Sequence, residues 1–99
     1  MIFENPEFEW DSNKSEQNRI ARGFGFDFAT AMFKDEVLIR EDNRRDYGEV
    51  RYLAIGPLEN LFLTVVYTWR SDRVRIISAR NAHRSERDAY RKAYPTRDS

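Results

Sequence analysis

The sequence predicts an α+β fold, in which a small antiparallel sheet of about four to five strands packs with two N-terminal helices and one C-terminal helix. Three observations support this prediction. Helix-capping residues and a glycine frame a polar segment near the N-terminus. Four strand-like stretches joined by short connections follow in the middle of the chain. An arginine-rich polar segment then runs to Pro95, where a helix is expected to end.

The N-terminal region predicts a short strand over residues 8–10, followed by a helix. Asp11 and the two residues after it are good N-cap residues, so the helix begins there. It ends at about Arg22, because Gly23 readily adopts the left-handed conformation that closes a helix. The helix is mostly polar, so it covers a sheet edge or presents a polar face for use.

The second helix is predicted over residues 28–33, capped by Asp27, with aromatic side chains that require burial. The strands that follow form an antiparallel meander, because connections of roughly two to six residues favour hairpins. The stretch 61–69 is apolar on both faces and is placed at the centre of the sheet. The remaining predicted elements are strands over 37–40, 49–55 (closed by Gly56-Pro57) and 73–80, and a helix over 82–94.

Composition predicts one domain spanning residues 1–99. The chain has no cysteine, which excludes disulfides and thiolate chemistry and fits a reducing compartment. It has no apolar run of membrane-spanning length and no signal-like N-terminus, so we expect a cytoplasmic protein. Residues 70–99 carry nine basic and four acidic side chains, a net charge of +5, although the whole chain is neutral. Such a basic end is typical of a nucleic-acid surface or of a surface that binds an acidic protein.

Arginines in the strand over 73–80 are the main functional signal. Guanidinium groups are rarely buried unless they are paired, and they bind phosphate with two hydrogen bonds. Strict alternation places Arg73, Arg75, Ile77 and Ala79 on one face, with Arg80 on the other. If this strand and the strand over 49–55 flank the central one, Arg51 and either Arg75 or Arg80 converge on one anion. The alternative is internal pairing, with Arg51 held by Glu49 or Glu86.

Other signals are weaker. His83 is the only histidine, a general acid or base by residue type, although a helix N-terminus disfavours its charged form. One histidine without cysteine and without spaced carboxylates predicts no metal site, and no cofactor is expected. No glycine-rich phosphate loop is present. Three aromatic side chains are able to stack on bases, but the core is their expected place: Trp10, Tyr67 and Trp69.

In sequence the chain resembles the BrnT family of bacterial toxins. The opening resembles the family in Phe8-Glu9-Trp10-Asp11, Lys14, Asn18, Gly23, Phe26, Ala29 and Phe33-Lys34-Asp35. The middle matches in Glu49-Val50-Arg51 and Ile55-Gly56. The end matches in Leu63-Thr64-Val65-Val66-Tyr67-Thr68, Arg75-Ile76-Ile77-Ser78-Ala79-Arg80, Glu86-Arg87 and Tyr90.

The resemblance implies a RelE-like fold and a metal-independent endoribonuclease that arrests translation, the toxin half of a type II toxin–antitoxin pair. It also implies a BrnA-type antitoxin with a ribbon-helix-helix domain, whose complex with the toxin binds operator DNA through the antitoxin. Stabilising the phosphate charge is a task that arginines and lysines perform. The expected site residues are Arg51, Arg75 and Arg80 on the phosphate, Lys14 as a further cation, Glu49 as base or orienter, Arg22 and His83 as possible additions, and Arg73, Arg84 and Arg87 as substrate-binding residues.

One departure from the family pattern opens alternatives. Where the family commonly has Lys-His-Gly, this chain has Ala21-Arg22-Gly23, and an arginine does not release its proton at physiological pH. If that histidine is essential, the protein is a weakened or inactive toxin that binds an antitoxin and acts as a corepressor. A third alternative, suggested by the basic C-terminal segment, is an RNA-binding domain without chemistry.

Overall fold

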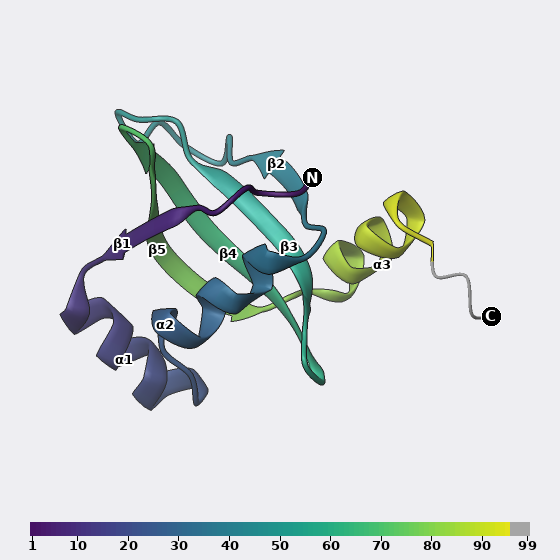
Figure 1. Cartoon of the computed structure of the whole chain (residues 1–99), viewed down its shortest axis with the longest axis horizontal. Helices are drawn as coiled ribbons and strands as arrows, with labels where there is room; N and C mark the ends of the chain where they lie inside the picture. Colours follow the sequence, from purple (N-terminus) through teal and green to yellow (C-terminus); the bar gives the residue numbers. More distant parts are fainter. Residues whose placement is uncertain (96–99) are drawn as a thin grey trace.

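The computed structural model describes residues 1–95 of the chain. Five strands lie in one sheet, with helices before them and one after them (Figure 1), which confirms the α+β prediction. No helix among these residues has the length and apolar character to cross a bilayer. The elements are β1 (Glu7–Trp10), α1 (Ser12–Arg22), α2 (Phe26–Ala29), the 3₁₀-helix η1 (Thr30–Lys34), β2 (Leu38–Glu41), β3 (Tyr52–Leu58), β4 (Leu61–Arg70), β5 (Arg73–Asn81) and α3 (Arg84–Ala93).

The strand order is β1-β5-β4-β3-β2, and β2 to β5 form the predicted antiparallel meander with β4 at its centre. The sheet differs from the predicted antiparallel sheet in its first strand, because β1 pairs with β5 in parallel and makes the sheet mixed. A parallel pair needs a long crossover, and here the whole chain between β1 and β5 provides it. This arrangement places the acidic strand β1 beside the arginine-rich strand β5.

The ends of α1 follow the prediction. The Asp11 side chain accepts hydrogen bonds from the backbone N–H groups of Asn13 and Lys14 at 2.9 and 3.1 Å. At the other end Gly23 adopts φ of 89°, and its N–H donates to the Arg19 carbonyl. Such caps satisfy backbone groups that a helix end would otherwise leave without partners.

Three predicted boundaries are wrong. The second helix begins earlier, after Gly25, and changes to 3₁₀ geometry at Thr30, so Asp27 lies in its first turn and does not cap it. The last helix begins at Arg84 rather than at residue 82. β3 starts at Tyr52, which leaves Glu49 in the preceding loop, and it continues to Leu58. Gly56 allows this continuation, because a Cβ there would lie 3.2 Å from Val37 and 3.3 Å from Met32.

One face of the sheet packs against α2 and η1 and forms the core (Figure 1). Tyr67 is 1% exposed and meets the Phe33 ring edge-on at 5.8 Å. The core prediction is therefore confirmed for Tyr67 and, with partial burial, for Trp10. It is wrong for Trp69, which is 42% exposed although it stacks on Phe3, because it lies near the outer end of β4.

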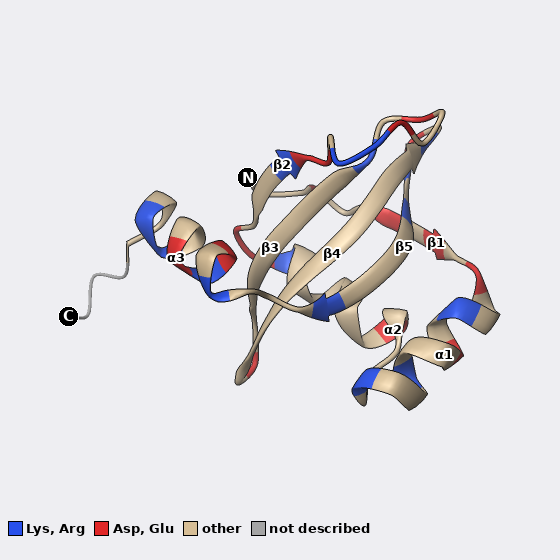
Figure 2. Ribbon diagram, turned by 180° about the vertical axis from the view of Figure 1, so that it is seen from behind, with Lys and Arg blue, Asp and Glu red and all other residues tan. Residues whose placement is uncertain are grey.

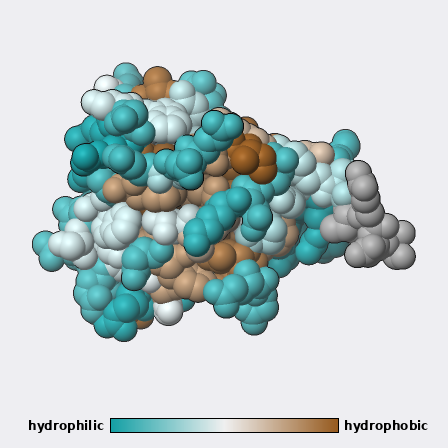
Figure 3. Space-filling view, in the orientation of Figure 1, coloured by the Kyte–Doolittle hydropathy of each residue, from teal (hydrophilic) through white to brown (hydrophobic). Residues whose placement is uncertain are grey.

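The opposite face of the sheet is turned toward the viewer in Figure 2. Among the described residues, no helix crosses its middle, and α3 lies at one side. The face that carries the helices shows patches of hydrophobic surface between hydrophilic groups (Figure 3). We call the face seen in Figure 2 the open face, and the candidate site lies on it and at its β5 edge.

Candidate functional site

A β-bulge in β5 determines which arginines share the open face. Opposite residues in an antiparallel pair project to the same side of a sheet. Val66 of β4 lies opposite Ser78, whereas the next residue, Tyr67, lies opposite Ile76. Ile77 therefore has no partner and is the extra residue of the bulge. The alternation of faces along β5 shifts by one residue at this point.

The bulge brings Arg75 and Arg80 to the same face. Arg75 lies opposite Thr68 and Arg80 opposite Thr64, and these two threonines share one face of β4. The prediction that strict alternation puts Arg80 on the other face from Arg75 is wrong, because it did not include the extra residue. Ala79, expected beside Arg75, is fully buried in the core on the helix side.

Arg51 joins the same face from the opposite side of β4. It precedes Tyr52, which pairs with Tyr67, so its place in the ladder is beside Thr68. Its carbonyl accepts a hydrogen bond from the Asp42 N–H at 2.8 Å, which continues the sheet by one residue. Arg51, Thr68 and Arg75 thus form a row, with Cα atoms of the two arginines ~10 Å apart by strand spacing. The predicted arrangement, with β3 and β5 flanking β4, is confirmed.

Each of these arginines contacts a glutamate. Arg75 Nη1 donates to Glu9 of β1 at 2.7 Å, and Arg51 Nε lies 3.3 Å from Glu49. Arg51 also lies over the Tyr47 ring, 4.0 Å from its centroid. The side chains of Arg75 and Arg51 keep 29% and 25% of their surface exposed, so both remain accessible to a ligand.

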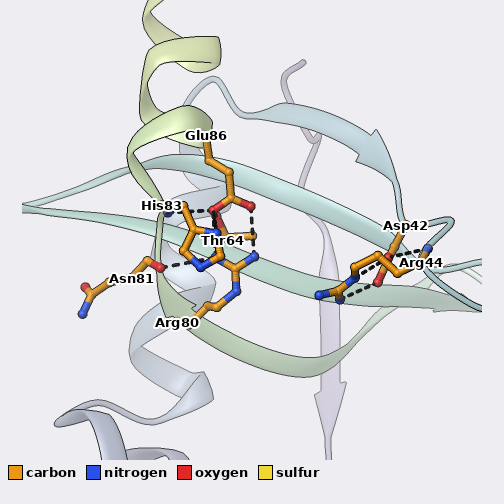
Figure 4. Close-up of polar contacts among 7 residues, drawn as sticks. All are labelled: Asp42, Arg44, Thr64, Arg80, Asn81, His83 and Glu86. Carbon is orange, nitrogen blue, oxygen red and sulfur yellow. Dashed lines mark hydrogen bonds and ion pairs between the residues drawn. The ribbon is translucent and has the colours of Figure 1, made fainter.

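The third arginine, Arg80, belongs to a more buried cluster (Figure 4). Its two terminal nitrogens donate to the two Glu86 oxygens at 2.7 and 2.9 Å, a bidentate pair. Thr64 Oγ1 and the His83 N–H also donate to Glu86, at 3.0 and 2.7 Å. Burial by itself raises the pKa of Glu86, but hydrogen bonds from Arg80, His83 and Thr64 outweigh it and lower the pKa to about 2. Glu86 therefore pairs with Arg80 and not with Arg51.

His83 is the N-cap of α3, and its imidazole is largely exposed. Its Nδ1 lies 3.6 Å from Glu86 Oε1, at the Arg80 end of the open face. Arg75 is distant from this point, because four residues of β4, or ~13 Å, separate the partners of Arg75 and Arg80. The histidine is thus positioned near one arginine of the site rather than between all three.

The three arginines predicted to bind substrate do not lie together. Arg73 is at the outer end of β5 and lies 3.4 Å from Glu7. Arg84 is exposed on α3 and makes a 4.0 Å contact with Asp88. Arg87 lines a cavity between α3 and the β3–β4 hairpin, and its Nε has no hydrogen-bond partner among the described residues. The structure therefore spreads these three residues over two regions.

Lys14 and Arg22, the two cations predicted on the first helix, line a cavity between α1 and β5. Ser78, the residue after the bulge, lines the same cavity. These cations therefore flank the β5 edge of the open face, beside the strand that carries Arg75 and Arg80.

Sequence reasoning missed Glu9 and Thr64 as partners of the site arginines. Neither has a local signal in the sequence. Glu9 and Arg75 are 66 residues apart and meet only through the parallel β1–β5 pair, and Thr64 is 22 residues from Glu86. It also missed a cluster at the far end of the open face, where buried Asp42 accepts two hydrogen bonds from Arg44 at 2.8 Å (Figure 4). The side-chain hydrogen bonds from Arg44 lower the pKa of Asp42 to about 2, against the opposing effect of burial.

Carboxylates and the histidine of the described residues form no group of three or more able to hold a metal ion. The open face carries three guanidinium groups, several carboxylates and, at one end, one imidazole. Such a set binds anions and stabilises developing negative charge.

Comparison with known proteins identifies the family. No curated protein matches the chain. The family model described as "Ribonuclease toxin, BrnT, of type II toxin-antitoxin system" matches residues 10–86 of the 99 residues. The matched segment runs from the end of β1 to the glutamate that holds Arg80, and so includes the open face and its bulge. The chain belongs to the BrnT family of ribonuclease toxins of type II toxin–antitoxin systems, whose members act on RNA and have an antitoxin partner.

Proposed function

We propose that the protein is an endoribonuclease that cleaves RNA without a metal ion and thereby arrests translation. The observation that carries the proposal is that Arg51, Arg75 and Arg80 project to the same open face, where the bulge at Ile77 turns Arg80 to the side of Arg75. Membership of a ribonuclease toxin family supports the choice of RNA as the anion. Guanidinium groups supply the positive charge that a phosphate in reaction requires.

The proposed reaction is attack of an RNA 2′-oxygen on the adjacent phosphorus. The 2′-hydroxyl loses its proton to a base, a bond forms between the 2′-oxygen and phosphorus, and the bond from phosphorus to the 5′-oxygen breaks. The products are a 2′,3′-cyclic phosphate and a 5′-hydroxyl, which forms when the leaving 5′-oxygen takes up one proton. Negative charge grows on the non-bridging oxygens, and donors preorganised around them lower the barrier.

In this proposal Arg75 and Arg51 exchange a carboxylate for the phosphate. Their contacts with Glu9 and Glu49 are single ion pairs at partly exposed side chains, which contribute little to stability and break at low cost. Glu49, released from Arg51, is then the base or the group that orients the 2′-hydroxyl. His83 lies beside Arg80 and is positioned to move a proton at that end of the site.

The proposed partner is a BrnA-type antitoxin with a ribbon-helix-helix domain, which neutralises the toxin in a hetero-oligomer. Operator DNA is reached through the antitoxin alone. The basic character of the C-terminal third supports association with an acidic segment of such a partner, because complementary charge accelerates encounter and selects partners.

A second candidate function is antitoxin binding without cleavage. The specific observation in its favour is that all three open-face arginines already have glutamate partners, and Arg80 is held by two strong hydrogen bonds. Arg22 stands where the family commonly has histidine. It also favours this candidate, because an arginine does not release its proton at physiological pH. In that case the protein acts as a corepressor.

The decisive experiment incubates the purified protein with RNA in excess EDTA, beside Arg80→Ala and Arg70→Ala. Arg70 is exposed at the end of β4, so replacing it with alanine removes the same charge outside the site. We expect cleavage by the wild type and by Arg70→Ala, and loss of ~10²–10³ in rate for Arg80→Ala. In a bacterial host, expression of the wild type or of Arg70→Ala should arrest growth, whereas expression of Arg80→Ala should not.

Other outcomes separate the candidates. RNA that stays intact with folded wild-type protein, together with tight antitoxin binding, supports the corepressor and contradicts the nuclease. Intact RNA bound with steep salt dependence supports a nucleic-acid-binding domain without chemistry. Cleavage that EDTA abolishes contradicts metal independence.

A further inference from the structure

The face of α1 turned toward β5 is polar where packing would favour apolar residues. Helix positions 14, 17, 18, 21 and 22 lie on one side by helical spacing, and this side lines a cavity of about 320 Å³ against β5. A helix normally buries an apolar stripe against its sheet. Here the stripe is Lys, Gln, Asn, Ala and Arg, and the corner that α1 occupies is covered mainly by hydrophilic groups (Figure 3).

The cavity has a cationic lining without a carboxylate. Its walls come from Lys14, Gln17, Asn18, Ala21, Arg22, Phe26, Ile77 and Ser78. Three other cavities on the described surface each contain an aspartate or a glutamate. Within residues 1–95, Lys14 and Arg22 form no ion pair, in contrast to the open-face arginines. An anion is therefore the ligand that this cavity favours.

Lys14 occupies a helix position that is unfavourable for a cation, and Arg22 is held in place by hydrogen bonds. Lys14 lies in the first turn of α1, where the helix dipole disfavours a cation, and no residue of that turn is acidic, although the Asp11 cap precedes it. Arg22 Nη1 donates to the Asn18 side chain at 3.0 Å and to the Ala79 carbonyl of β5 at 3.1 Å. Asn18 is itself buried and donates to the Phe24 carbonyl at 2.8 Å. These bonds use only one nitrogen of the guanidinium group.

The cavity borders the open face at the bulge, because Ile77 and Ser78 line it. Ser78 lines the cavity, projects to the side of Arg75 and Arg80, and lies between them along β5. A strand of RNA that crosses the open face at β5 therefore meets this cavity next. A cavity of this volume suits one phosphate with part of its ribose.

We propose that the cavity between α1 and the β5 bulge binds one phosphodiester group of the RNA, next to the phosphate that reacts on the open face. Lys14 and Arg22 supply the charge, and the Ser78 hydroxyl donates a hydrogen bond. The site is a binding subsite, which increases affinity for longer substrates and fixes the register of the strand. This inference rests on the proposed function for its choice of RNA, and its test is independent of cleavage.

The test uses a hexanucleotide of 2′-O-methyl RNA, which lacks the hydroxyl needed for cleavage, and follows backbone amide shifts of Ile77 and Ser78 by NMR during titration. Lys14→Gln is the informative variant, because the Lys14 side chain makes no hydrogen bond or ion pair among the described residues and its loss leaves the fold intact. Lys34→Gln removes the same charge from an exposed position on η1 and is the matched control.

We expect the wild type and Lys34→Gln to bind the analogue with shifts at Ile77 and Ser78, and Lys14→Gln to bind about 5- to 10-fold more weakly. The slope of log affinity against log salt should become shallower by ~0.7 for the lost phosphate contact. Lys14→Arg should restore the affinity. Equal affinity of Lys14→Gln and wild type, or shifts confined to other residues, overturns the proposal. Binding of inorganic phosphate but not of the oligonucleotide also overturns it, as a site for free anions only.

Failure of this proposal and failure of the proposed function give different results. If the wild type cleaves RNA and Lys14→Gln binds and cleaves equally well, the nuclease holds and the subsite is wrong. If the wild type never cleaves RNA but binds the analogue in a Lys14-dependent manner, the subsite holds and the nuclease is wrong.

Discussion

Replacing Glu86 with glutamine tests whether the cluster at Arg80 is held by charge. Glu86→Gln keeps the size and one acceptor oxygen but removes the negative charge that faces Arg80. The Glu86 side chain is 9% exposed and the Arg80 side chain is 18% exposed, so water compensates little of the loss. We expect the free energy of unfolding at pH 7 to fall by about 2–3 kcal/mol.

The pH dependence gives a sharper form of the same prediction. The pKa of Glu86 is about 2 in the folded protein, against 4.5 as its ordinary value. Because the folded-state pKa is lowered, the stabilisation is complete above pH 4.5 and is lost as the pH falls toward 2. A shift of this size corresponds to about 3 kcal/mol in full, of which about 2 kcal/mol is lost by pH 3.

Urea denaturation of wild type and Glu86→Gln at pH 7, 5, 4 and 3 measures this effect. The difference in unfolding free energy between the two proteins cancels other titrating groups and should shrink by about 2 kcal/mol between pH 7 and pH 3. Glu16→Gln, at an exposed carboxylate paired with Arg19, is the control and should leave the unfolding curve unchanged. A difference for Glu86→Gln that stays constant across this range would refute the reasoning.

Three further predictions concern the site and its frame. Arg75→Ala should lower EDTA-resistant RNA cleavage by ~10²–10³ while circular dichroism stays unchanged, and Arg70→Ala should cleave normally; equal rates for the two would exclude Arg75 from the site. Asp42→Asn should cost about 1–2 kcal/mol in urea denaturation at pH 7, and most of this cost should disappear as the pH falls to 2, since the pKa of Asp42 is lowered to about 2; a loss that does not vary with pH contradicts the ion-pair account. Gly56→Ala should lower the unfolding free energy by about 1–3 kcal/mol, because the new Cβ overpacks the core, and an unchanged Tm would show that the core yields there.

The arginine–glutamate pairs of the open face have a consequence for substrate choice. In the proposed function, phosphate replaces a carboxylate at Arg51 and at Arg75, so we expect an anion with two or more phosphate groups to compete better than a single phosphate. The paired glutamates also keep the free protein from presenting a bare cationic face to every polyanion.

Local patterns in the sequence predicted much of the fold. The caps of α1 at Asp11 and Gly23, and the central place of β4, depend on interactions within a few residues or on composition along one strand. The change of α2 to 3₁₀ geometry at Thr30 was not predicted, because no cap or breaker residue in the sequence marks it.

The sequence by itself determined that arginines are concentrated in the strand 73–80 and that the chain has the residue pattern of its family. Only the tertiary structure decided which arginines act together. The bulge at Ile77 turns Arg80 to the side of Arg75, and the parallel pairing of β1 brings Glu9 to Arg75. Both depend on register between strands, which is set by packing across the whole sheet, and a shift of one residue moves every later side chain to the opposite face.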